Sequence, residues 1–263
     1  MKAIILAAGE GKRLRPLTKD VPKCMVTLFG KSILERQIEI FRQCGINDIS
    51  IVTGYCHDKI TFPNIRYFRN EKYDTTNMVE TLFCAKEILD DSVIVSYGDI
   101  IFGKKVLQQL INAKDDLCVV IDKDWYKYWK IRFQNPLDDA ESLITDENNY
   151  IKNIGQKVNS LNEIMGQYIG LMKFQNLGLN FLKEFYEKAK KESLKGNNPL
   201  NSKLGFEKSY ITDLLQALIL SGCKIKSVPI NNGWLEVDTK HDYEVYNRLY
   251  EENKLHEFIL LDE

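Results

Sequence analysis

The sequence has almost no net charge, which limits the partners it is suited to bind. Its 263 residues include 36 lysines and arginines against 37 aspartates and glutamates, a formal net charge of −1. Proteins that bind nucleic acid or an anionic membrane surface usually show a basic excess. We therefore expect neither partner, and any recognition of phosphate has to come from a few local cations.

Cysteine and histidine are present but lack the spacings of metal sites. None of the six cysteines belongs to a C-x-x-C pair, and the three histidines show no metal-ligand spacing. A zinc site and a disulfide framework are therefore not expected. The sequence also lacks a leader-peptide pattern and an apolar run of membrane-spanning length. These absences predict a cytoplasmic protein without a membrane partner.

Glycine is missing where the common nucleotide motifs require it. The stretch Ile4–Thr18, IILAAGEGKRLRPLT, is an apolar run that ends in a glycine-containing turn, as phosphate-binding loops do. A dinucleotide fingerprint would need a third glycine in place of Leu14. A Walker loop would need a glycine five residues before Gly11 and a Ser or Thr after Lys12. Neither hydride transfer nor ordinary ATP hydrolysis is indicated.

What the loop does contain is a set of cations beside small residues. Lys12, Arg13 and Arg15 follow the turn, and the small residues before them allow backbone amides to approach a nucleotide closely. This combination suits a triphosphate. From the loop alone, a glycine-rich turn with a solvated basic face remains an equal alternative.

Strands and helices alternate over the first part of the chain, which predicts a doubly wound, mostly parallel α/β sheet. Ligands of such sheets lie beyond the carboxyl ends of the strands, where both the opening loop and Asp99 are expected. The expected strands are residues 2–7, 49–52, 65–68 and 93–95, and the expected helices are residues 33–44 and 78–88.

The pattern changes after residue 117, where several short extended segments follow one another. We interpret them as an antiparallel elaboration of the same sheet, so residues 1–263 form a single domain. The expected extended segments are 117–121, 129–133, 142–145, 150–154 and 168–174.

The N-terminal region matches a long gapped motif. The family pattern is L-A-A-G-x-G-x-R-x-x-P-x-T followed by P-K-x-[ML]-x-x-[VIL]-x-G-[KR]-x-[IL]-[LI]. The segment AIILAAGEGKRLRPLTKDVPKCMVTLFGKSILERQI agrees nearly throughout. It resembles nucleotidyltransferases that join a nucleoside triphosphate to a phosphorylated small molecule. Asn77, Gly98–Asp99, Gly166–Gly170 and Trp234–Asp238 follow in the family's order.

This resemblance covers essentially the whole chain and implies a Rossmann-like nucleotidyltransferase fold. It implies a nucleotide-binding part over 1–116 and an acceptor-binding elaboration with the second metal carboxylate over 117–238. A C-terminal helix is expected over 239–263.

The middle of the chain is similar to one branch of that family, the small cytidylyltransferases. The residues concerned are Trp125, Trp129, Arg132, NPLDDAE (Asn135–Glu141) and Ile154–Lys157. Enzymes of this branch act on phosphocholine, aminoalkyl phosphonates, phosphoglutamine and related headgroups. The resemblance implies that CTP and a small phosphorylated acceptor give a CDP-linked product and pyrophosphate, in capsule biosynthesis or headgroup modification.

The reaction brings two anions together, so it needs cations and in-line positioning more than covalent help. Arg13 is suited to hold the β- and γ-phosphates, with Lys12 and Arg15 assisting. The resemblance assigns Lys23 to the acceptor phosphate or the α-phosphate. Arg13 and Lys23 are thus the predicted catalytic residues, although most single basic residues are merely solvated.

Two aspartates are the predicted ligands of Mg²⁺. Magnesium takes few protein carboxylates and completes its shell with substrate phosphate oxygens and water. Asp99 follows a strand in Tyr97-Gly98-Asp99, and Asp238 ends Trp234–Asp238. Glu236 is a possible third carboxylate, and an ion-paired strand residue is its alternative.

Small residues predict how the base is recognised. Main-chain atoms of Leu6, Ala7, Ala8 and Gly9 can approach a pyrimidine ring closely. Gly11 and Lys12 complete the predicted nucleotide contacts, together with Thr76 and Asn77 near the edge of the base. Asn77 can also cap the helix that follows it.

Aromatic and polar residues are candidates for binding the non-phosphate end of the acceptor. For each of them, packing in the core or at the surface is an equal alternative. Trp125, Tyr126, Tyr128 and Trp129 are a possible cage for a cationic amine, and Arg132 is a possible partner of a substrate carboxylate. The predicted acceptor-binding residues are Trp129, Arg132, Gln167, Tyr168 and Tyr210.

Two other functions remain open from the sequence. One is a uridylyl- or thymidylyltransferase for a sugar 1-phosphate, against which stand the short chain and the Trp-rich segment 125–141. The other is a non-catalytic relative that senses nucleotides, which would be expected to lose charged residues that are retained here. The oligomeric state is expected to be a monomer or a homodimer.

Overall fold

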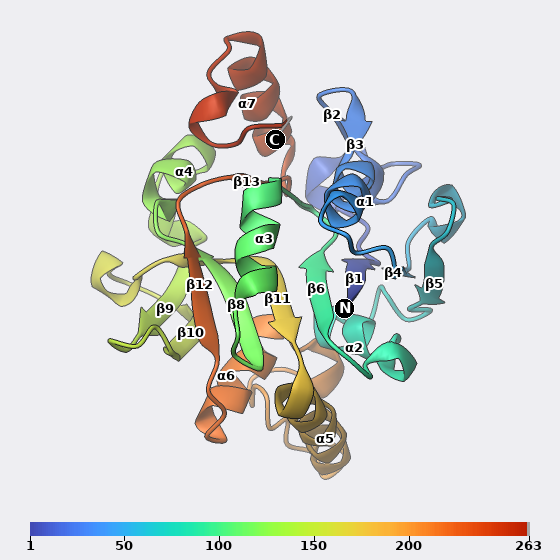
Figure 1. Cartoon of the computed structure of the whole chain (residues 1–263), viewed down its shortest axis with the longest axis vertical. Coiled ribbons are helices and arrows are strands. Elements are labelled where there is room, and N and C mark those ends of the chain that lie inside the picture. The colour runs from blue at the N-terminus through green and yellow to red at the C-terminus, as the bar shows by residue number, and fades with distance from the viewer. Residues whose placement is uncertain (262–263) are drawn as a thin grey trace.

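A seven-stranded sheet forms the centre of the molecule in the computed structural model, which describes residues 1–261 (Figure 1). β1 is parallel to β4 and β6, β4 is parallel to β5, and β8 is parallel to β12. Only β11 runs antiparallel to both of its neighbours, β6 and β8. In spatial order the strands are β12 (Lys226–Ile230), β8 (Leu117–Asp122), β11 (Gln167–Phe174), β6 (Val93–Tyr97), β1 (Lys2–Ala7), β4 (Ile49–Thr53) and β5 (Arg66–Arg69).

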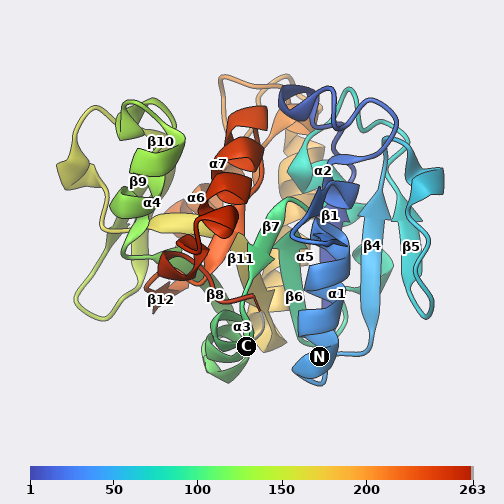
Figure 2. The same cartoon turned by 90° about the horizontal axis from the view of Figure 1, so that it is seen from above.

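Helices cover both faces of this sheet, because each central strand is apolar on both sides. Successive residues of β1 alternate between two cores: Ala3 and Ile5 pack in one, Ile4 and Leu6 in the other. Helices α1, α3, α4 and α7 contribute to the first core, and α2, α5 and α6 contribute to the second (Figure 2). The helices are α1 (Ile33–Gln43), α2 (Met78–Phe83), α3 (Lys104–Asn112), α4 (Trp125–Arg132), α5 (Asn176–Ser193), α6 (Ile211–Leu220) and α7 (Lys240–Glu251).

Three small antiparallel pairs complete the fold. β9 (Glu141–Thr145) pairs with β10 (Ile151–Lys157) in a hairpin beside the sheet. β13 (Trp234–Glu236) pairs with β7 (Ile100–Phe102), and β2 (Thr27–Leu28) pairs with β3 (Lys31–Ser32). The predicted doubly wound, mostly parallel sheet with an antiparallel elaboration is confirmed.

Two predicted elements differ from the structure. The segment 129–133, expected as extended, lies largely in helix α4, whose buried residues Trp125, Tyr128, Trp129 and Arg132 have the i, i+3, i+4, i+7 spacing of one helical face. The C-terminal helix is shorter than the expected 239–263. α7 begins after the N-cap Thr239, and a 3-10 turn over Leu255–Glu257 follows it. Residues 262 and 263 lie outside the described part.

Among residues 1–261, none of the helices has the length and apolar character needed to cross a membrane.

The carboxyl ends of β1 and β6 approach each other closely at Gly98. The Gly98 amide donates to the Leu6 carbonyl oxygen at 2.9 Å. A Cβ atom at this position would lie 2.6 Å from that oxygen and 3.0 Å from the Cα of Ala7. A larger residue would therefore push the Asp99 turn away from the opening loop.

We expect Gly98→Ala to lower the free energy of unfolding by about 1–3 kcal/mol, since backbone atoms must shift to admit the methyl group. Urea denaturation followed by circular dichroism measures this. Gly9→Ala is the matched control, because a Cβ there meets nothing within 4 Å. Equal unfolding midpoints for Gly98→Ala and the unsubstituted chain would contradict the close approach.

Candidate active site

A cleft of about 620 Å³ lies beyond the carboxyl ends of β1 and β6, where a doubly wound sheet is expected to bind its ligand. It is open to solvent on one side and receives residues from the opening loop, the β6 end, the β9 and β11 wall, and β13. Its lining residues are Leu6–Arg13, Lys23, Cys24, Tyr73, Asp74, Thr76–Met78, Thr81, Tyr97–Asp99, Trp129, Asp139, Glu141, Gln167–Gly170, Tyr210, Thr212, Trp234, Glu236 and Asp238.

The opening loop is held in shape by its own backbone and by Lys23. Gly11 has a φ of +67°, a left-handed conformation that favours glycine, and its carbonyl accepts a hydrogen bond from the Thr18 hydroxyl at 2.7 Å. A Cβ on Gly11 would lie 2.9 Å from the Cβ of Lys23. A 3-10 turn over Lys12–Leu14 then buries Leu14. Leu14, which stands where a dinucleotide fingerprint would have its third glycine, thus anchors the loop in the core.

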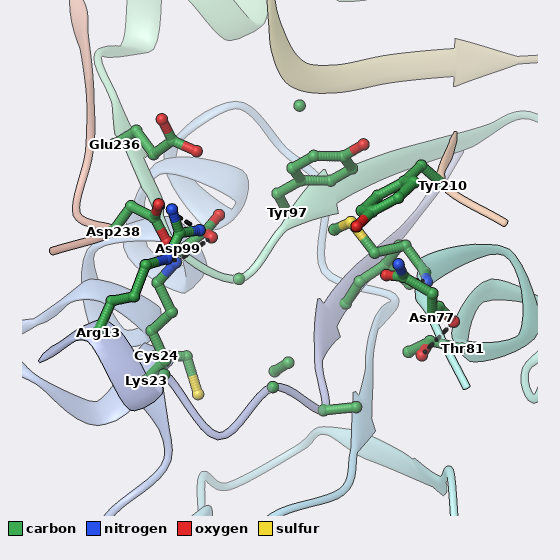
Figure 3. Close-up of a pocket in the computed structure, with 18 of the residues that line it drawn as sticks. Arg13, Lys23, Cys24, Asn77, Thr81, Tyr97, Asp99, Tyr210, Glu236 and Asp238 are labelled. Carbon is green, nitrogen blue, oxygen red and sulfur yellow. Dashed lines mark hydrogen bonds and ion pairs between the residues drawn. The ribbon is translucent and has the colours of Figure 1, made fainter. Parts of the chain in front are cut away.

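Lys23 lies between the two predicted metal ligands. Its ammonium donates to Asp99 Oδ2 and to Asp238 Oδ1, each at 2.6 Å. The guanidinium of Arg13 forms an ion pair with Asp238 Oδ2 at 2.5 Å, and its side chain is otherwise largely exposed. Figure 3 shows these four residues gathered at one end of the cleft. All four predicted charged residues therefore meet at one point.

The charges of this group stabilise one another. Burial alone would lower the pKa of Lys23, but the carboxylates of Asp99 and Asp238 outweigh it and the pKa is raised. Burial alone would raise the pKa of Asp238, but Lys23 and Arg13 outweigh it and the pKa is lowered. Both groups are therefore charged at neutral pH.

Backbone pairing brings Asp238 to Asp99. β13 pairs with β7, which follows Asp99 directly, and the Val237 amide donates to the Asp99 carbonyl at 2.9 Å. The indole of Trp234 fixes the start of β13 by donating to Asp122 Oδ2 at 2.9 Å. The two aspartates, far apart in the chain, thus lie on adjacent backbone segments.

Arg132 stabilises the segment around Asp238 from the protein interior and does not line the cleft. Its side chain is fully buried and forms ion pairs with Glu236 at 2.8 Å and Asp242 at 3.0 Å. Asp242 in turn accepts hydrogen bonds from the backbone amides of Asp238 and Thr239. The prediction that Arg132 contacts the acceptor is therefore replaced by a positioning role: it holds Glu236 and, through Asp242, the segment with Asp238.

Glu236 interacts with Arg132 and with the charges of Asp99 and Asp238. It lines the cleft, and burial raises its pKa to about 7, with Arg132 opposing the shift and the charges of Asp99 and Asp238 adding to it. The ion-paired alternative for Glu236 matches its contact with Arg132.

The predicted aromatic cage does not form. The side chains of Trp125 and Tyr128 extend from α4 into the core, and the side chain of Tyr126 is exposed at the surface. Tyr128 uses its hydroxyl to accept from the Glu236 amide at 2.7 Å. Of the four aromatic residues only Trp129 lines the cleft. The reason is that the buried face of α4, which carries Trp125, Tyr128 and Trp129, packs into the core, and Tyr126 lies off this face.

The predicted nucleotide-binding residues line the cleft, with the exception of Arg15. Thr76 and Asn77 lie at its edge with Leu6–Gly11 and Lys12. Asn77 caps α2 through its Oδ1, which accepts from the Met78 amide at 2.9 Å, and its Nδ2 donates to the Lys208 carbonyl. Arg15 instead turns outward and pairs with Glu10.

Of the predicted acceptor residues, Gln167 and Tyr168 lie on the β11 wall, and Tyr210 lies elsewhere. The segment before Tyr210 is bonded to the start of α2, since the Asn77 amide donates to the Glu207 carbonyl. Figure 3 accordingly shows Tyr210 with Asn77, across Tyr97 from the charged group. Tyr210 is thus placed on the side predicted for the nucleotide.

Several lining residues were not assigned by sequence reasoning. Tyr97 is the residue before the Gly98–Asp99 turn and packs edge-on against Tyr168, with ring centroids 5.7 Å apart. Asp139 and Glu141 belong to the segment NPLDDAE, to which no role was given. Their signal in the sequence is a pair of acidic residues at the start of an extended segment.

The residues present fit a divalent cation held by two carboxylates. Asp99 Oδ1 is buried and has no hydrogen-bond partner within the described residues, and carboxylate oxygens are the ligands that Mg²⁺ prefers. In residues 1–261, no group of three or more His, Cys, Asp or Glu side chains is arranged to hold a metal. The rest of the coordination shell would therefore have to come from substrate and water.

The sequence matches an NTP transferase family and is similar to two cytidylyltransferases. Residues 3–158 match the family model described as MobA-like NTP transferase domain. CTP:phosphoglutamine cytidylyltransferase of Campylobacter jejuni is 44% identical over 256 residues, covering 93% of this chain and 98% of that protein. Choline-phosphate cytidylyltransferase of Streptococcus pneumoniae is 40% identical over 117 residues, covering 43% of this chain and 51% of that protein.

Solved structures share the fold. CTP:phosphocholine cytidylyltransferase from Streptococcus pneumoniae superposes with a TM-score of 0.74 at 23% identity, over 95% of this chain and 98% of that one. The inositol-1-phosphate CTP transferase from T. maritima has a TM-score of 0.68 at 19% identity, over 98% and 97% of the two chains. At these identities the likeness concerns the fold.

Proposed function

This chain belongs to the MobA-like NTP transferase family and is a nucleotidyltransferase, and we propose that it transfers a cytidylyl group from CTP to a small phosphorylated acceptor, with phosphoglutamine as the first candidate. The observation that supports the transfer chemistry is the placement of Lys23 and Arg13 against Asp99 and Asp238 in one cleft. The support for CTP and for phosphoglutamine is the full-length relative at 44% identity.

In this reaction an oxygen of the acceptor phosphate attacks the α-phosphorus of CTP. The bond between the α-phosphorus and its bridging oxygen breaks, and pyrophosphate leaves with that oxygen. Charge spreads over the phosphoryl oxygens in the transition state, so fixed cations aimed at those oxygens lower the barrier. Lys23 is held rigidly enough to do this, because two carboxylates orient its ammonium.

Arg13 and Lys12 suit the leaving pyrophosphate. Both side chains line the cleft at its open side and are largely exposed, so they can reach phosphates that enter from solvent. Arg13 presents a planar fork that matches two phosphate oxygens.

Asp99 and Asp238 would hold Mg²⁺, which when bound would neutralise triphosphate charge. Glu236, held in place by Arg132, would provide a third carboxylate near them.

The base would lie against the small residues Ala7, Ala8 and Gly9. Two backbone groups there are already used, since the Leu6 and Ala8 carbonyls accept from Gly98 and Tyr55. One hydrogen of the Asn77 amide is left to donate to a carbonyl oxygen of the base. The product would be a CDP-linked donor for modification of a surface polysaccharide or headgroup. A cytoplasmic location and a monomeric or homodimeric state stay predictions.

The test is pyrophosphate release with Mg²⁺ in a matrix of four nucleoside triphosphates and five acceptors. The acceptors are L-glutamine phosphate, phosphocholine, 2-aminoethylphosphonate, glycerol phosphate and glucose 1-phosphate. We expect release with CTP and L-glutamine phosphate. Release with UTP or dTTP and glucose 1-phosphate alone would favour the sugar nucleotidyltransferase alternative. No release with any pair, while CTP binding persists, would favour the non-catalytic alternative.

A further inference from the structure

The buried face of α1 carries one polar side chain among apolar ones. Its members are Ile33, Leu34, Gln37, Ile38, Ile40 and Phe41. Gln37 is the polar residue of this set, and its side chain is 1% exposed. Burying an amide is unfavourable unless its hydrogen-bonding groups find partners inside the protein. The partners of Gln37 therefore indicate what this residue contributes.

The partners of Gln37 lie at both ends of the turn that carries Asp99. Its Nε2 donates to the Tyr97 carbonyl at 2.8 Å and to the Ile100 carbonyl at 2.7 Å. Its Oε1 accepts from the Ser96 hydroxyl at 2.8 Å. A primary amide has two N–H hydrogens and one carbonyl oxygen, so all three groups are used. One side chain of α1 thus ties the two ends of the turn together.

Two backbone hydrogen bonds hold the same turn from other directions. The Gly98 amide donates to a carbonyl of β1, and the Val237 amide donates to the Asp99 carbonyl, each at 2.9 Å. Neither bond fixes the distance between the two ends of the turn, which Gln37 spans. Without Gln37 the turn would open more often, and the Asp99 carboxylate would move with it.

Building on the proposed function, we propose that Gln37 is a positioning residue, which holds Asp99 in the place where it contacts Lys23 and would bind Mg²⁺. Gln37 does not line the cleft, so it acts only through the turn. Catalytic and metal-ligating groups have to be held to within about 0.5 Å, and a displacement of about 1 Å can lower a rate about 100-fold. A side chain buried behind the site therefore controls the reaction without touching a substrate.

Gln37→Met removes the amide and keeps an unbranched side chain of similar length. Amide hydrogen exchange, followed by NMR without metal or nucleotide, measures the effect on the turn directly. The Gly98 and Val237 amides report on it, because both donate hydrogen bonds that hold the turn. Relative to amides of β4, we expect these two to exchange at least about tenfold faster in Gln37→Met than in the unsubstituted chain.

Gln216→Met is the matched control, because it makes the same change at another buried glutamine. Gln216 is 8% exposed on α6, its Oε1 accepts from the Ile154 amide at 2.8 Å, and it does not line the cleft. We expect the reciprocal pattern, with faster exchange at Ile154 and unchanged exchange at Gly98 and Val237. Equal acceleration of all three amides in both variants would mean general destabilisation and would overturn the positioning role.

Kinetics provides a second readout. Gln37→Met should lower kcat about 10- to 100-fold and raise the Mg²⁺ concentration for half-maximal rate, while KM for CTP changes by less than about threefold. Because Gln37 acts through Asp99, adding Gln37→Met to Asp99→Asn should lower kcat by less than about threefold further. Losses that multiply in the double variant would contradict a role through Asp99.

Ser96→Ala keeps the inference testable if Gln37→Met does not fold. The Ser96 hydroxyl is buried and donates to Gln37 Oε1, which orients the amide with its nitrogen toward the two carbonyls. We expect the same pattern at smaller size, about two- to fivefold in both exchange and kcat. No change in either quantity would overturn the inference.

The two proposals fail differently. Absence of turnover by the unsubstituted chain with every acceptor would overturn the proposed function, and the exchange pattern would still decide whether Gln37 holds the turn. Unchanged exchange and unchanged kcat in Gln37→Met, with turnover in the unsubstituted chain, would overturn the role of Gln37 and leave nucleotidyl transfer standing.

Discussion

Lys23→Met should lower kcat by about 100- to 1,000-fold while KM for CTP changes by less than about fivefold. Methionine keeps the length and apolar character of the side chain and removes only the ammonium. That ammonium lies 2.6 Å from both Asp99 and Asp238, at the point where charge develops on the phosphoryl group. Its loss therefore affects the transition state more than the bound substrate.

The same substitution should also affect stability. Without Lys23, Asp99 loses its ion pair and Asp238 keeps its ion pair with Arg13. We expect the free energy of unfolding at pH 7 to fall by about 2 kcal/mol in the absence of metal.

Single-turnover kinetics of pyrophosphate release, with urea denaturation in parallel, measures both effects. Lys19→Met is the matched control, because Lys19 is an exposed lysine of the same loop and does not line the cleft. Retention of more than about a third of kcat in Lys23→Met would show that Lys23 is a structural residue only.

Asp99→Asn should lower kcat by about 100- to 10,000-fold and raise the concentration of Mg²⁺ needed for half-maximal rate. Asparagine preserves the shape of the side chain but removes a negative charge and replaces one oxygen by a hydrogen-bond donor. Within the described residues Asp99 Oδ1 is buried without a hydrogen-bond partner, so we expect this oxygen to be affected most by the change. Metal affinity depends directly on that carboxylate.

Two measurements test the role of Asp99. The rate is followed against Mg²⁺ concentration, and Mn²⁺ binding to the nucleotide-free chain is followed by electron paramagnetic resonance. Asp20→Asn, an exposed aspartate outside the cleft, is the control. Unchanged Mg²⁺ dependence and unchanged Mn²⁺ binding in Asp99→Asn would contradict the assignment. Because Asp99 and Lys23 contact each other, the double variant should lose less than the product of the two single losses.

Local sequence rules predicted the elements that depend on neighbouring residues. The alternation in β1 follows from side chains that point to opposite faces along a strand, and it is seen in the two cores that Ala3 and Ile4 join. Asn77 caps α2 as expected, and Thr239 caps α7 with Asp242 in a capping box. Each of these depends on contacts within a few residues.

The prediction of segment 129–133 as extended was wrong because its local signals conflict. Trp, Ile and Phe favour strands in isolation, whereas the spacing of the buried residues from Trp125 to Arg132 fits one helical face. Tertiary contacts decide between these, since Arg132 is neutralised by Asp242, which lies 110 residues further along the chain. No local rule identifies that partner.

The sheet, the loop and the candidate charged residues can be predicted from the amino-acid sequence, because strand periodicity and the long N-terminal motif are local properties of the chain. Which of these charges lie in contact depends on the folded chain. Lys23 contacts Asp99 and Asp238 across 76 and 215 residues, and the β13–β7 pairing is what brings these aspartates together.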